Sequence, residues 1–556
     1  MNRARVVPLL TAATGFAWLA ATMTYSPAVA APPSVSPHAT AHLGRSVPQS
    51  APRQAPATAA APASHAKRQH PRASRKSAIA LATNHVRVCG NAKVLGAGPT
   101  KPPKGAIVVH AGNNSRVQWG KRHATYWFAP GVHTLGRGQY SQIDPGDNSR
   151  YIGAPGAVIN GRHLNNYAFG GRANSVTISY LTIKGFGKNG GNFDQGVINV
   201  DSSPGWTIDH SLIRDNAGAG VMLGSRDRLS YDCLRNNQQY GFNAYSSRGP
   251  AHLTLDHNEI AGNDTFNWEA RKPGCGCTGG GKFWYVNGAV ITDNWVHDNH
   301  SVGLWADTDN RGFDFDGNYF EANYDSGLMY EISYNASITN NLFERNAIGR
   351  GRAYRGFPVP ALYVSESGSD WRVHSKYRAT FVISGNTFIN NWSGIVLWEN
   401  SNRFCGSPAN SSSGNCTLDE PKVANLRTCT ESHLRNAKAA HVPDYYDLCR
   451  WKTRNVSVTK NQFSFVPKQI GSDCTLKRGC GVMGLFSEWG SYPSWSPYLR
   501  KSVEYHITFD QGNHFAGNTY AGPWKFMVLE QNNVVGWSAW QHHFGQDSAS
   551  TLSPNP

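Results

Sequence analysis

Short apolar strands separated by polar turns recur along most of the chain. The pattern Asn, any residue, an apolar residue, two residues of any kind and a second Asn occurs in full six times. The asparagines of these copies are Asn258/Asn263, Asn294/Asn299, Asn318/Asn323, Asn341/Asn346, Asn386/Asn391 and Asn513/Asn518. The apolar residues between them are Ile260, Val296, Phe320, Phe343, Phe388 and Phe515. Partial copies end at Asn216 and Asn237 or begin at Asn461. A period of about two dozen residues indicates a solenoid, in which each coil packs on its neighbours.

A second strand follows each second asparagine and usually opens with Gly. Such strands are predicted at 220–224, 241–245, 303–307, 327–331, 361–365 and 394–398. The residue after the opener and the residue two places later are apolar, so they should point into the core while the alternate residues face outward. Strand-like triplets at 176–178, 206–208 and 456–458 add to the pattern. Helical repeats would show a 3.6-residue period and few glycines, whereas this chain has 57.

Asparagine suits the turns because it tolerates a left-handed backbone, and stacked asparagine side chains can hydrogen-bond along a solenoid. The repeat resembles that of the pectin-lyase-like superfamily over roughly residues 100–545, including the stretches 151–159 and 540–548. This resemblance implies an all-β, single-stranded right-handed parallel β-helix. The superfamily includes lyases, hydrolases, epimerases and non-catalytic surface proteins. A solenoid needs covered ends, and we expect residues 86–140 and 520–550 to supply them.

The chain divides into three regions. Residues 1–30 have a basic start, an apolar run and the small residues Ala28-Val29-Ala30, which together predict a signal peptide, with an uncleaved membrane anchor as the alternative. Residues 31–84 are rich in Ala, Pro and Ser and lack acids, which predicts a disordered linker. Residues 85–550 should form the β-helix domain, with a disulfide-tied insertion at 403–452. We therefore expect a secreted protein, extracellular or associated with the cell envelope, without membrane contact after signal cleavage.

The net charge of +17 overstates how basic the domain is. Nine of the 53 basic side chains precede residue 86, where no acid occurs, and the rest of the chain carries +8. This mild surplus weakly favours an anionic partner. It is far from the clustered basic face of a nucleic-acid-binding protein, so we expect no nucleic acid partner.

The ten cysteines fit an exported protein that oxidises its thiols. Cys275 and Cys277 lie too close in sequence to be independent of one another. Short loops could join further cysteines, although the sequence does not fix their connectivity. These further pairs are Cys405 with Cys416, Cys429 with Cys449 and Cys474 with Cys480, which leaves Cys89 with Cys233. Zinc binding is the alternative, but no Cys-x-x-Cys pair occurs.

The outward positions of the second strands form two columns. One column contains Asn243, Trp305, Met329 and Tyr363, and the other contains Tyr245, Asp307, Glu331, Ser365 and Trp398. Because neighbouring coils lie about 4.7–4.9 Å apart, Asp307 and Glu331 should be direct neighbours on an exposed face. Two such carboxylates repel, so the pKa of one should rise unless a cation intervenes. A row of exposed aromatic residues beside them indicates a binding surface for sugar rings.

More charged residues lie near these columns. Lys282 should face outward beside Trp305, with Trp284 beside Asp307, because the other register would bury a charged lysine in the core. An insertion with Arg350, Arg352 and Arg355 can reach over the same face. Asp309, Glu366 and Glu399 lie near the strand ends. The alternative for Asp309 is a role in a turn, and for the two glutamates it is pairing with the arginines.

Three functions fit these residues. A glycoside hydrolase, which we favour slightly, would use Glu331 as the acid and Asp307 as the nucleophile or base, with Lys282 orienting the substrate. A calcium-dependent lyase acting on a uronate polymer would use Lys282 or an arginine as the base and bind calcium through Asp307, Asp309 and Glu331. A non-catalytic carbohydrate-binding surface protein is the third. In each case we expect a monomer with a polysaccharide partner. The expected substrate contacts are Trp284, Trp305, Tyr363, Trp398, Arg350, Arg352, Arg355, Glu366 and Glu399.

Overall fold

A computed structural model describes residues 87–245, 249–273, 275–354, 356–369, 380–399, 452–487, 505 and 507–555. The predicted signal peptide and linker lie outside these residues. So does the predicted insertion at 403–452, with both of its cysteine pairs, except for Lys452. Within the described ranges, no helix is long and apolar enough to cross a membrane.

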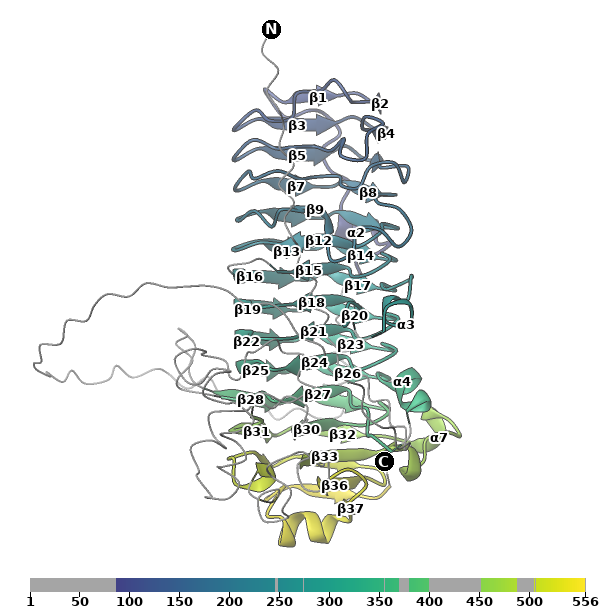
Figure 1. Ribbon diagram of the computed structural model, residues 1–556, viewed down its shortest axis with the longest axis vertical. Helices are drawn as coiled ribbons and strands as arrows, with labels where there is room; N and C mark the ends of the chain where they lie inside the picture. Colours follow the sequence, from purple (N-terminus) through teal and green to yellow (C-terminus); the bar gives the residue numbers. More distant parts are fainter. Residues whose placement is uncertain are drawn as a thin grey trace, which may run out of the picture.

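The strands stack into three long sheets, with the coils one above another (Figure 1). Sheet I contains β1 (Ile107–Val109), β3 (Thr125–Phe128), β5 (Arg150–Gly153), β7 (Thr177–Ser179), β10 (Thr207–Asp209), β13 (Arg228–Ser230), β16 (Ala251–Asp256), β19 (Asn287–Thr292), β22 (Arg311–Asp316), β25 (Tyr334–Thr339), β28 (Phe381–Ser384), β31 (Val456–Thr459) and β34 (His514–Ala516).

Sheet II follows sheet I in each coil. It contains β2 (Gly112–Asn113), β4 (Gly131–Thr134), β6 (Ala157–Asn160), β8 (Thr182–Lys184), β11 (Leu212–Arg214), β14 (Cys233–Arg235), β17 (Glu259–Ala261), β20 (Trp295–His297), β23 (Tyr319–Glu321), β26 (Leu342–Glu344), β29 (Thr387–Ile389), β32 (Gln462–Ser464), β35 (Thr519–Ala521) and β38 (Thr551–Ser553).

Sheet III completes the coil. It contains β9 (Gly196–Ile198), β12 (Ala219–Leu223), β15 (Phe242–Ala244), β18 (Gly281–Phe283), β21 (Leu304–Ala306), β24 (Leu328–Glu331), β27 (Leu362–Ser365), β30 (Ile395–Glu399), β33 (Val482–Ser487), β36 (Lys525–Leu529) and β37 (Val534–Val535). The described helices are α2 (Ala92–Leu95), α3 (Trp268–Arg271), α4 (Ile348–Ala353), α7 (Pro467–Ile470), a 3₁₀ turn Leu476–Arg478 and a π-helical turn Ala539–His543. Neighbouring strands pair in parallel, except β36 with β37, so the predicted all-β parallel β-helix is confirmed.

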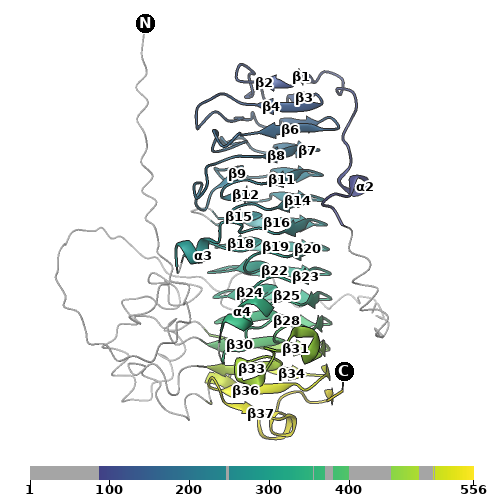
Figure 2. The same cartoon turned by 90° about the vertical axis from the view of Figure 1, so that its right-hand side faces the viewer.

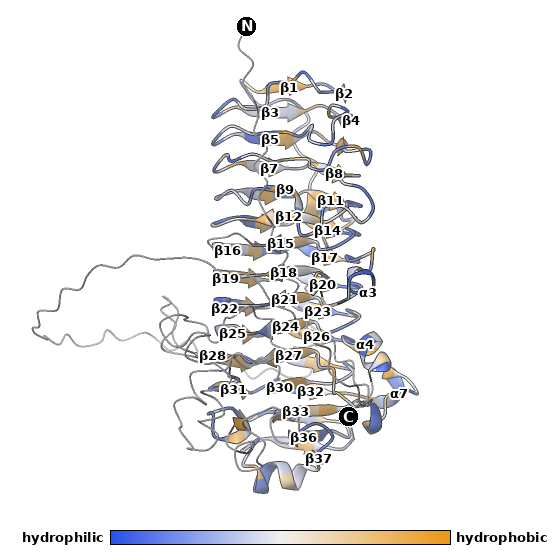
Figure 3. Ribbon diagram, viewed as in Figure 1, coloured by the Kyte–Doolittle hydropathy of each residue, from blue (hydrophilic) through white to orange (hydrophobic). Residues whose placement is uncertain are grey.

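The core is built from the apolar residue of each repeat. Phe320, Phe343, Phe388, Phe463 and Tyr520 stack along sheet II with ring centroids 4.7–4.9 Å apart. This spacing is the distance between coils, so each ring packs on the ring of the next coil. Apolar residues concentrate on the strands and polar residues on the turns (Figure 3).

The asparagines form hydrogen-bonded ladders inside the turns, as the sequence predicted. In the first ladder, for example, the backbone N–H and Nδ2 of Asn318 both donate to Oδ1 of Asn341, at 2.9 and 3.0 Å. The members of this ladder are Asn258, Asn294, Asn318, Asn341, Asn386, Asn461 and Asn518. A second ladder contains Asn216, Asn237, Asn263, Asn299, Asn323, Asn346 and Asn391. The ladders satisfy buried polar groups that otherwise would destabilise the turns.

One copy of the repeat lies out of phase with the others. Phe515 belongs to β34 of sheet I, whereas the middle residues of the other copies belong to sheet II. Asn518, the second asparagine of this copy, takes the place that the first asparagine occupies elsewhere, because Asn461 donates to it. The match at Asn513/Asn518 is therefore a coincidence of spacing and not a full copy.

The described chain begins beside the middle of sheet II. Cys89 forms a disulfide with Cys233 of β14, and α2 lies at the flank of the stack near β14 (Figure 2). The chain then returns toward β1, where the indole N–H of Trp127 donates to the carbonyl of Pro99. Gly98 has φ +69°, and a Cβ there would lie 2.2 Å from the Gly153 carbonyl oxygen, so only glycine fits. We call residues 87–105 the N-terminal brace. This part of the expected cap runs along the side of the coils and not over the first one.

Cys275 pairs with Cys277 and Cys474 pairs with Cys480, as the sequence predicted. The described cysteines are therefore all oxidised.

Candidate active site

The outward columns of sheet III have the predicted register. Lys282 of β18 pairs with Trp305 of β21, which pairs with Met329 of β24, and Met329 pairs with Tyr363 of β27. Ala306 of β21 pairs with Tyr330 of β24. Asp307 directly follows Ala306, and Glu331 directly follows Tyr330. The two carboxylates therefore occupy the same position on neighbouring coils.

Three of the four aromatic residues of these columns are buried, which corrects the prediction of an exposed ladder, and only Tyr245 is exposed. Trp305 and Tyr363 are each 5% exposed and Trp398 is 1% exposed. Phe357, from the segment that follows α4, packs on Tyr363 and Trp398 with ring centroids 6.5 and 5.1 Å apart. The cover comes from long connections between sheets II and III, which fold back over the outer face of sheet III.

Lys282 and Asp307 form a buried ion pair. Lys282 Nζ lies 2.9 Å from Asp307 Oδ2 and donates to the carbonyl of Gly276 at 2.5 Å. The ammonium group also lies over the rings of Trp305 and Trp284, at 3.8 and 4.4 Å from the ring centroids. A buried charge is costly unless it is paired and hydrogen-bonded, and Lys282 meets both conditions. Its outward register is confirmed, but it faces protein atoms and not solvent.

Other groups fix this pair. Asp307 Oδ1 accepts hydrogen bonds from the backbone and hydroxyl of Thr308, at 2.7 and 3.0 Å. The disulfide between Cys275 and Cys277 encloses Gly276, whose carbonyl receives Lys282. Burial raises the pKa of nearby Asp194 to about 6, while the charge of Lys282 acts in the opposite direction. The ion pair is thus a rigid part of the fold.

A cavity of about 930 Å³ opens over sheet III beside the pair. Trp305, Met329, Glu331 and Tyr363 line it from the strands. One wall comes from Asp264, Asn267, Glu269, Ala270, Pro273 and Thr278, in and around α3. Another comes from Ile348, Gly349, Arg350, Tyr354, Phe357, Val359 and Pro360, in and after α4. The turns that precede β21 and β24 complete the lining. A concave site of this size, in which apolar and aromatic side chains lie beside several polar and charged ones, can hold a ligand.

Four carboxyl groups of the lining were missed by the sequence analysis, those of Asp264, Glu269, Asp298 and Asp325, and burial shifts the pKa of two of them. Burial raises the pKa of Asp264 to about 7, against hydrogen bonds from Thr278 and the backbone of Trp268. Burial also raises the pKa of Asp325, although Arg350 lies 3.4 Å away. Both residues belong to turns, where acids are common, and no periodic signal separates a cavity turn from a solvent turn.

Among the remaining candidates that the structure describes, only Arg350 lines the cavity. Asp309 is paired with Arg311 at 3.2 Å and has φ +59°, which fits the alternative of a role in a turn. The described residues contain no group of three or more His, Cys, Asp or Glu side chains that could hold a metal, so the calcium site predicted at Asp307, Asp309 and Glu331 is not assembled. Glu399 accepts from the backbone of Thr453 at 2.9 Å.

The arginines of the basic insertion also differ in whether they line the cavity. Arg350 lines the cavity and contacts Tyr354, whereas Arg352 points toward α7 and donates to the carbonyl of Ile470 at 3.0 Å. Arg355 lies outside the described residues. Trp284, Trp398 and Glu366 do not belong to the lining.

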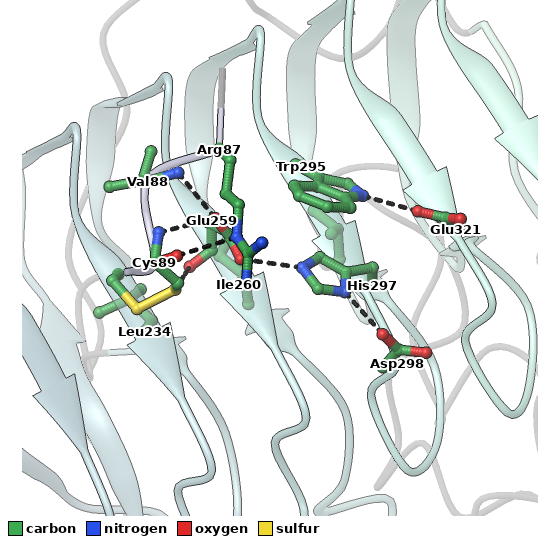
Figure 4. A network of polar contacts seen from close by, with 12 residues as sticks. Arg87, Val88, Cys89, Leu234, Glu259, Ile260, Trp295, His297, Asp298 and Glu321 are labelled. Atoms are coloured by element: carbon green, nitrogen blue, oxygen red, sulfur yellow. Dashed lines mark hydrogen bonds and ion pairs between the residues drawn. A yellow bond between two sulfur atoms is a disulfide. The ribbon is translucent and has the colours of Figure 1, made fainter. Parts of the chain in front are cut away.

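A polar network links the N-terminal brace to the cavity wall (Figure 4). The backbone N–H groups of Val88 and Cys89 both donate to Glu259 Oε2 at 2.7 Å. The other oxygen of Glu259 lies 3.1 Å from His297 Nε2, and His297 Nδ1 lies 2.8 Å from Asp298, which lines the cavity. Burial by itself would lower the pKa of His297, but Asp298 and Glu259 outweigh it and raise the pKa to about 9.

We expect the stability of the protein to fall as the pH rises through 9. The pKa of His297 in the folded state exceeds the ordinary value of 6.5, so the imidazolium stabilises the fold fully below about pH 6.5 and is lost as the pH rises through about 9. The contribution is about 3 kcal/mol. Urea unfolding between pH 6 and pH 10 should show this slope in the wild type and not in His297→Gln. Equal slopes in the two proteins would contradict the assignment.

Similarity to known proteins supports the architecture. The family model described as a right-handed β-helix region matches residues 195–359. Together with the three parallel sheets, this match shows that the chain folds as a right-handed parallel β-helix. No curated protein matches the chain.

Three solved structures illustrate the range of similar proteins. The Azotobacter vinelandii mannuronan C-5 epimerase AlgE4 A-module is 15% identical and covers 53% of this chain and 83% of its own, with a TM-score of 0.37. The catalytic domain of a GH87 α-1,3-glucanase in complex with tetrasaccharides is 11% identical and covers 83% of this chain and 70% of its own, with a TM-score of 0.38. PfbA, a surface adhesin of Streptococcus pneumoniae, is 12% identical and covers 49% and 80%, with a TM-score of 0.29.

Proposed function

We propose that this protein is a polysaccharide-active enzyme that cleaves glycosidic bonds as a glycoside hydrolase. The observation that carries the proposal is Glu331, which lines a 930 Å³ cavity and stands beside Asp307 on the neighbouring coil. Glycoside hydrolysis needs two carboxyl groups with different roles. Glu331 acts as the acid at the cavity. Asp307, which is next to it on the neighbouring coil but is not part of the lining, acts as the nucleophile or base.

The local contacts support different roles for the two groups. Asp307 is paired with Lys282 and accepts two hydrogen bonds from Thr308, which stabilise its ionised form. Glu331 is 5% exposed and borders the cavity, so its carboxyl group is placed to contact a bound sugar. Neighbouring coils lie about 4.8 Å apart, close to the ~5–5.5 Å between the carboxyl groups of enzymes that retain the anomeric configuration.

A uronate lyase has less support from the same site. Its calcium ligands do not come together in the described part of the chain. Of its proposed bases, Lys282 is held by an ion pair with Asp307 and a hydrogen bond to Gly276. The other candidate is an arginine, and Arg350 of the lining is paired with Asp325. We therefore favour hydrolysis.

The nature of the product tests the proposal. Purified protein is incubated with a panel of neutral and acidic polysaccharides, and reducing ends and near-ultraviolet absorbance are followed together. A hydrolase releases reducing ends without the absorbance of an unsaturated sugar. Absorbance that calcium chelation abolishes would establish the lyase, and binding without any product would establish a carbohydrate-binding protein.

The stereochemistry of the product identifies the second carboxyl group. Retention of the anomeric configuration, observed by NMR during the first turnovers, is expected for Asp307. Inversion would require a more distant partner of about 6.5–9.5 Å, and Asp325 would then be the first residue to test. We also propose that the enzyme acts outside the cell, because its described cysteines are all paired.

A further inference from the structure

The lining of the cavity carries more acidic than basic groups. Five carboxyl groups border it, those of Asp264, Glu269, Asp298, Asp325 and Glu331. Only two guanidinium groups do so, those of Arg345 and Arg350. Because the pKa of Asp264 is about 7, and Asp298 and Asp325 are paired with His297 and Arg350, little net charge remains in the lining to attract a charged ligand.

The charged groups of the walls already have partners within the protein. Asp325 lies 3.4 Å from Arg350 and accepts from the backbone of Ser326 at 2.7 Å. Asp298 is held by His297, and Glu269 accepts from the backbone of Gly276 at 3.1 Å. These acids therefore need no cationic group from a ligand as a partner. Arg350 likewise needs no anionic group, because it is already paired with Asp325.

One residue of the lining, Trp305, carries a buried neutral donor without an acceptor among the described residues. The indole Nε1 of Trp305 is buried and has no hydrogen-bond partner among the described residues. The ring lines the cavity and is fixed by Lys282, 3.8 Å from its centroid, and by Gly276 at its edge. A buried N–H without an acceptor is unfavourable, so an acceptor supplied by a ligand is a gain in binding.

We infer that the cavity binds an uncharged polysaccharide and that the Trp305 indole N–H donates to a hydroxyl or ring oxygen of the bound sugar. A sugar hydroxyl both donates and accepts, so one sugar can donate to carboxylates of the wall and accept from Trp305. Its apolar faces pack on Met329 and Tyr363, which follow Trp305 on the next two coils of the same column. This inference rests on the proposed function, from which it takes the class of ligand, a polysaccharide. It adds that the polysaccharide carries no charge.

Binding to three classes of oligosaccharide tests the charge of the ligand. The Glu331→Gln variant is probed with neutral hexose and pentose oligosaccharides, oligouronates and glucosamine oligomers, at low and at high salt. We expect the neutral class to bind at least tenfold more tightly than the other two, with an affinity that salt does not change. Tighter binding of oligouronates or of glucosamine oligomers would overturn the inference, and so would binding of none of the three.

Two tryptophan variants test the donor. Trp305→Phe should weaken binding of the preferred neutral oligosaccharide by about fivefold, because one neutral hydrogen bond is lost. Trp268→Phe is the matched control: its indole N–H is also buried without a partner among the described residues, but it does not line the cavity. Trp305→His restores a ring N–H and should recover part of the affinity. Near-ultraviolet circular dichroism confirms the fold of each variant, and equal affinities for Trp305→Phe and wild type would overturn the role of Trp305.

Experiment can contradict the inferred charge of the ligand and the proposed hydrolysis independently of each other. If the wild type releases reducing ends from a polyuronate, the hydrolase stands and the inference of an uncharged substrate fails. If a neutral oligosaccharide binds but stays intact, the inference stands and the proposed hydrolysis fails.

Discussion

Replacing Glu331 with glutamine should lower kcat on a cleaved polysaccharide by about 10³-fold, because the amide cannot transfer a proton to the leaving oxygen. Glutamine has nearly the same shape, so the cavity and the neighbouring ion pair of Lys282 with Asp307 should remain. Initial rates from reducing ends, measured at saturating substrate, give the effect directly. KM should change little, because Glu331 acts mainly on the reaction and not on binding.

Glu344→Gln is a suitable control for this variant. Glu344 lies on β26 of sheet II, accepts a hydrogen bond from Tyr319 and does not border the cavity. Its rate should stay within about twofold of the wild type. If Glu331→Gln keeps more than a tenth of the wild-type rate, the acid is a different residue. Asp307→Asn is a less selective test, because it leaves the buried Lys282 without its counter-ion.

Replacing Asp547 with leucine should lower the free energy of unfolding by about 4 kcal/mol, because several buried donors lose their acceptor together. Asp547 is fully buried and accepts from Trp540 Nε1 and the Tyr520 hydroxyl, both at 2.7 Å. It also accepts from Nδ2 of Asn518 at 2.8 Å, so it ends the first asparagine ladder. Leucine is unfavourable too at the observed φ of +54°.

Urea unfolding of Asp547→Leu and Asp547→Asn separates these contributions. Asparagine tolerates the left-handed backbone and keeps one acceptor oxygen, so we expect a loss of about 1–2 kcal/mol. If leucine costs no more than asparagine, the closing segment does not depend on this carboxylate.

The coil register was accessible from the sequence, whereas the burial of the site was not. Gly280, Gly303 and Gly327 open strands whose residues alternate strictly, so the neighbours of Lys282 and Glu331 follow from counting. The sequence leaves two registers that differ by one residue. The free-energy cost of placing the charged Lys282 in the apolar core excludes one of them, and the structure has the other.

The cover over sheet III comes from segments that follow no period. Phe357 buries Tyr363 and Trp398 from a connection whose path no repeat describes. Gly276 receives the Lys282 ammonium from a loop closed by its own disulfide. A repeat predicts the positions of coils relative to one another, but a connection folds according to contacts that form only when the stack exists. The same limit explains why Asp264 and Asp325 were missed.

The N-terminal brace also determines how the molecule would carry mechanical load. Because Cys89 is bonded to Cys233, tension applied at residue 87 reaches the stack at β14 and not at β1. A polymer chain held in the cavity would pull on β21 and β24, so the force would run only through the coils between these strands and β14. The coils from β1 to β11 would stay unloaded, and they could not be peeled from this end unless the disulfide broke first.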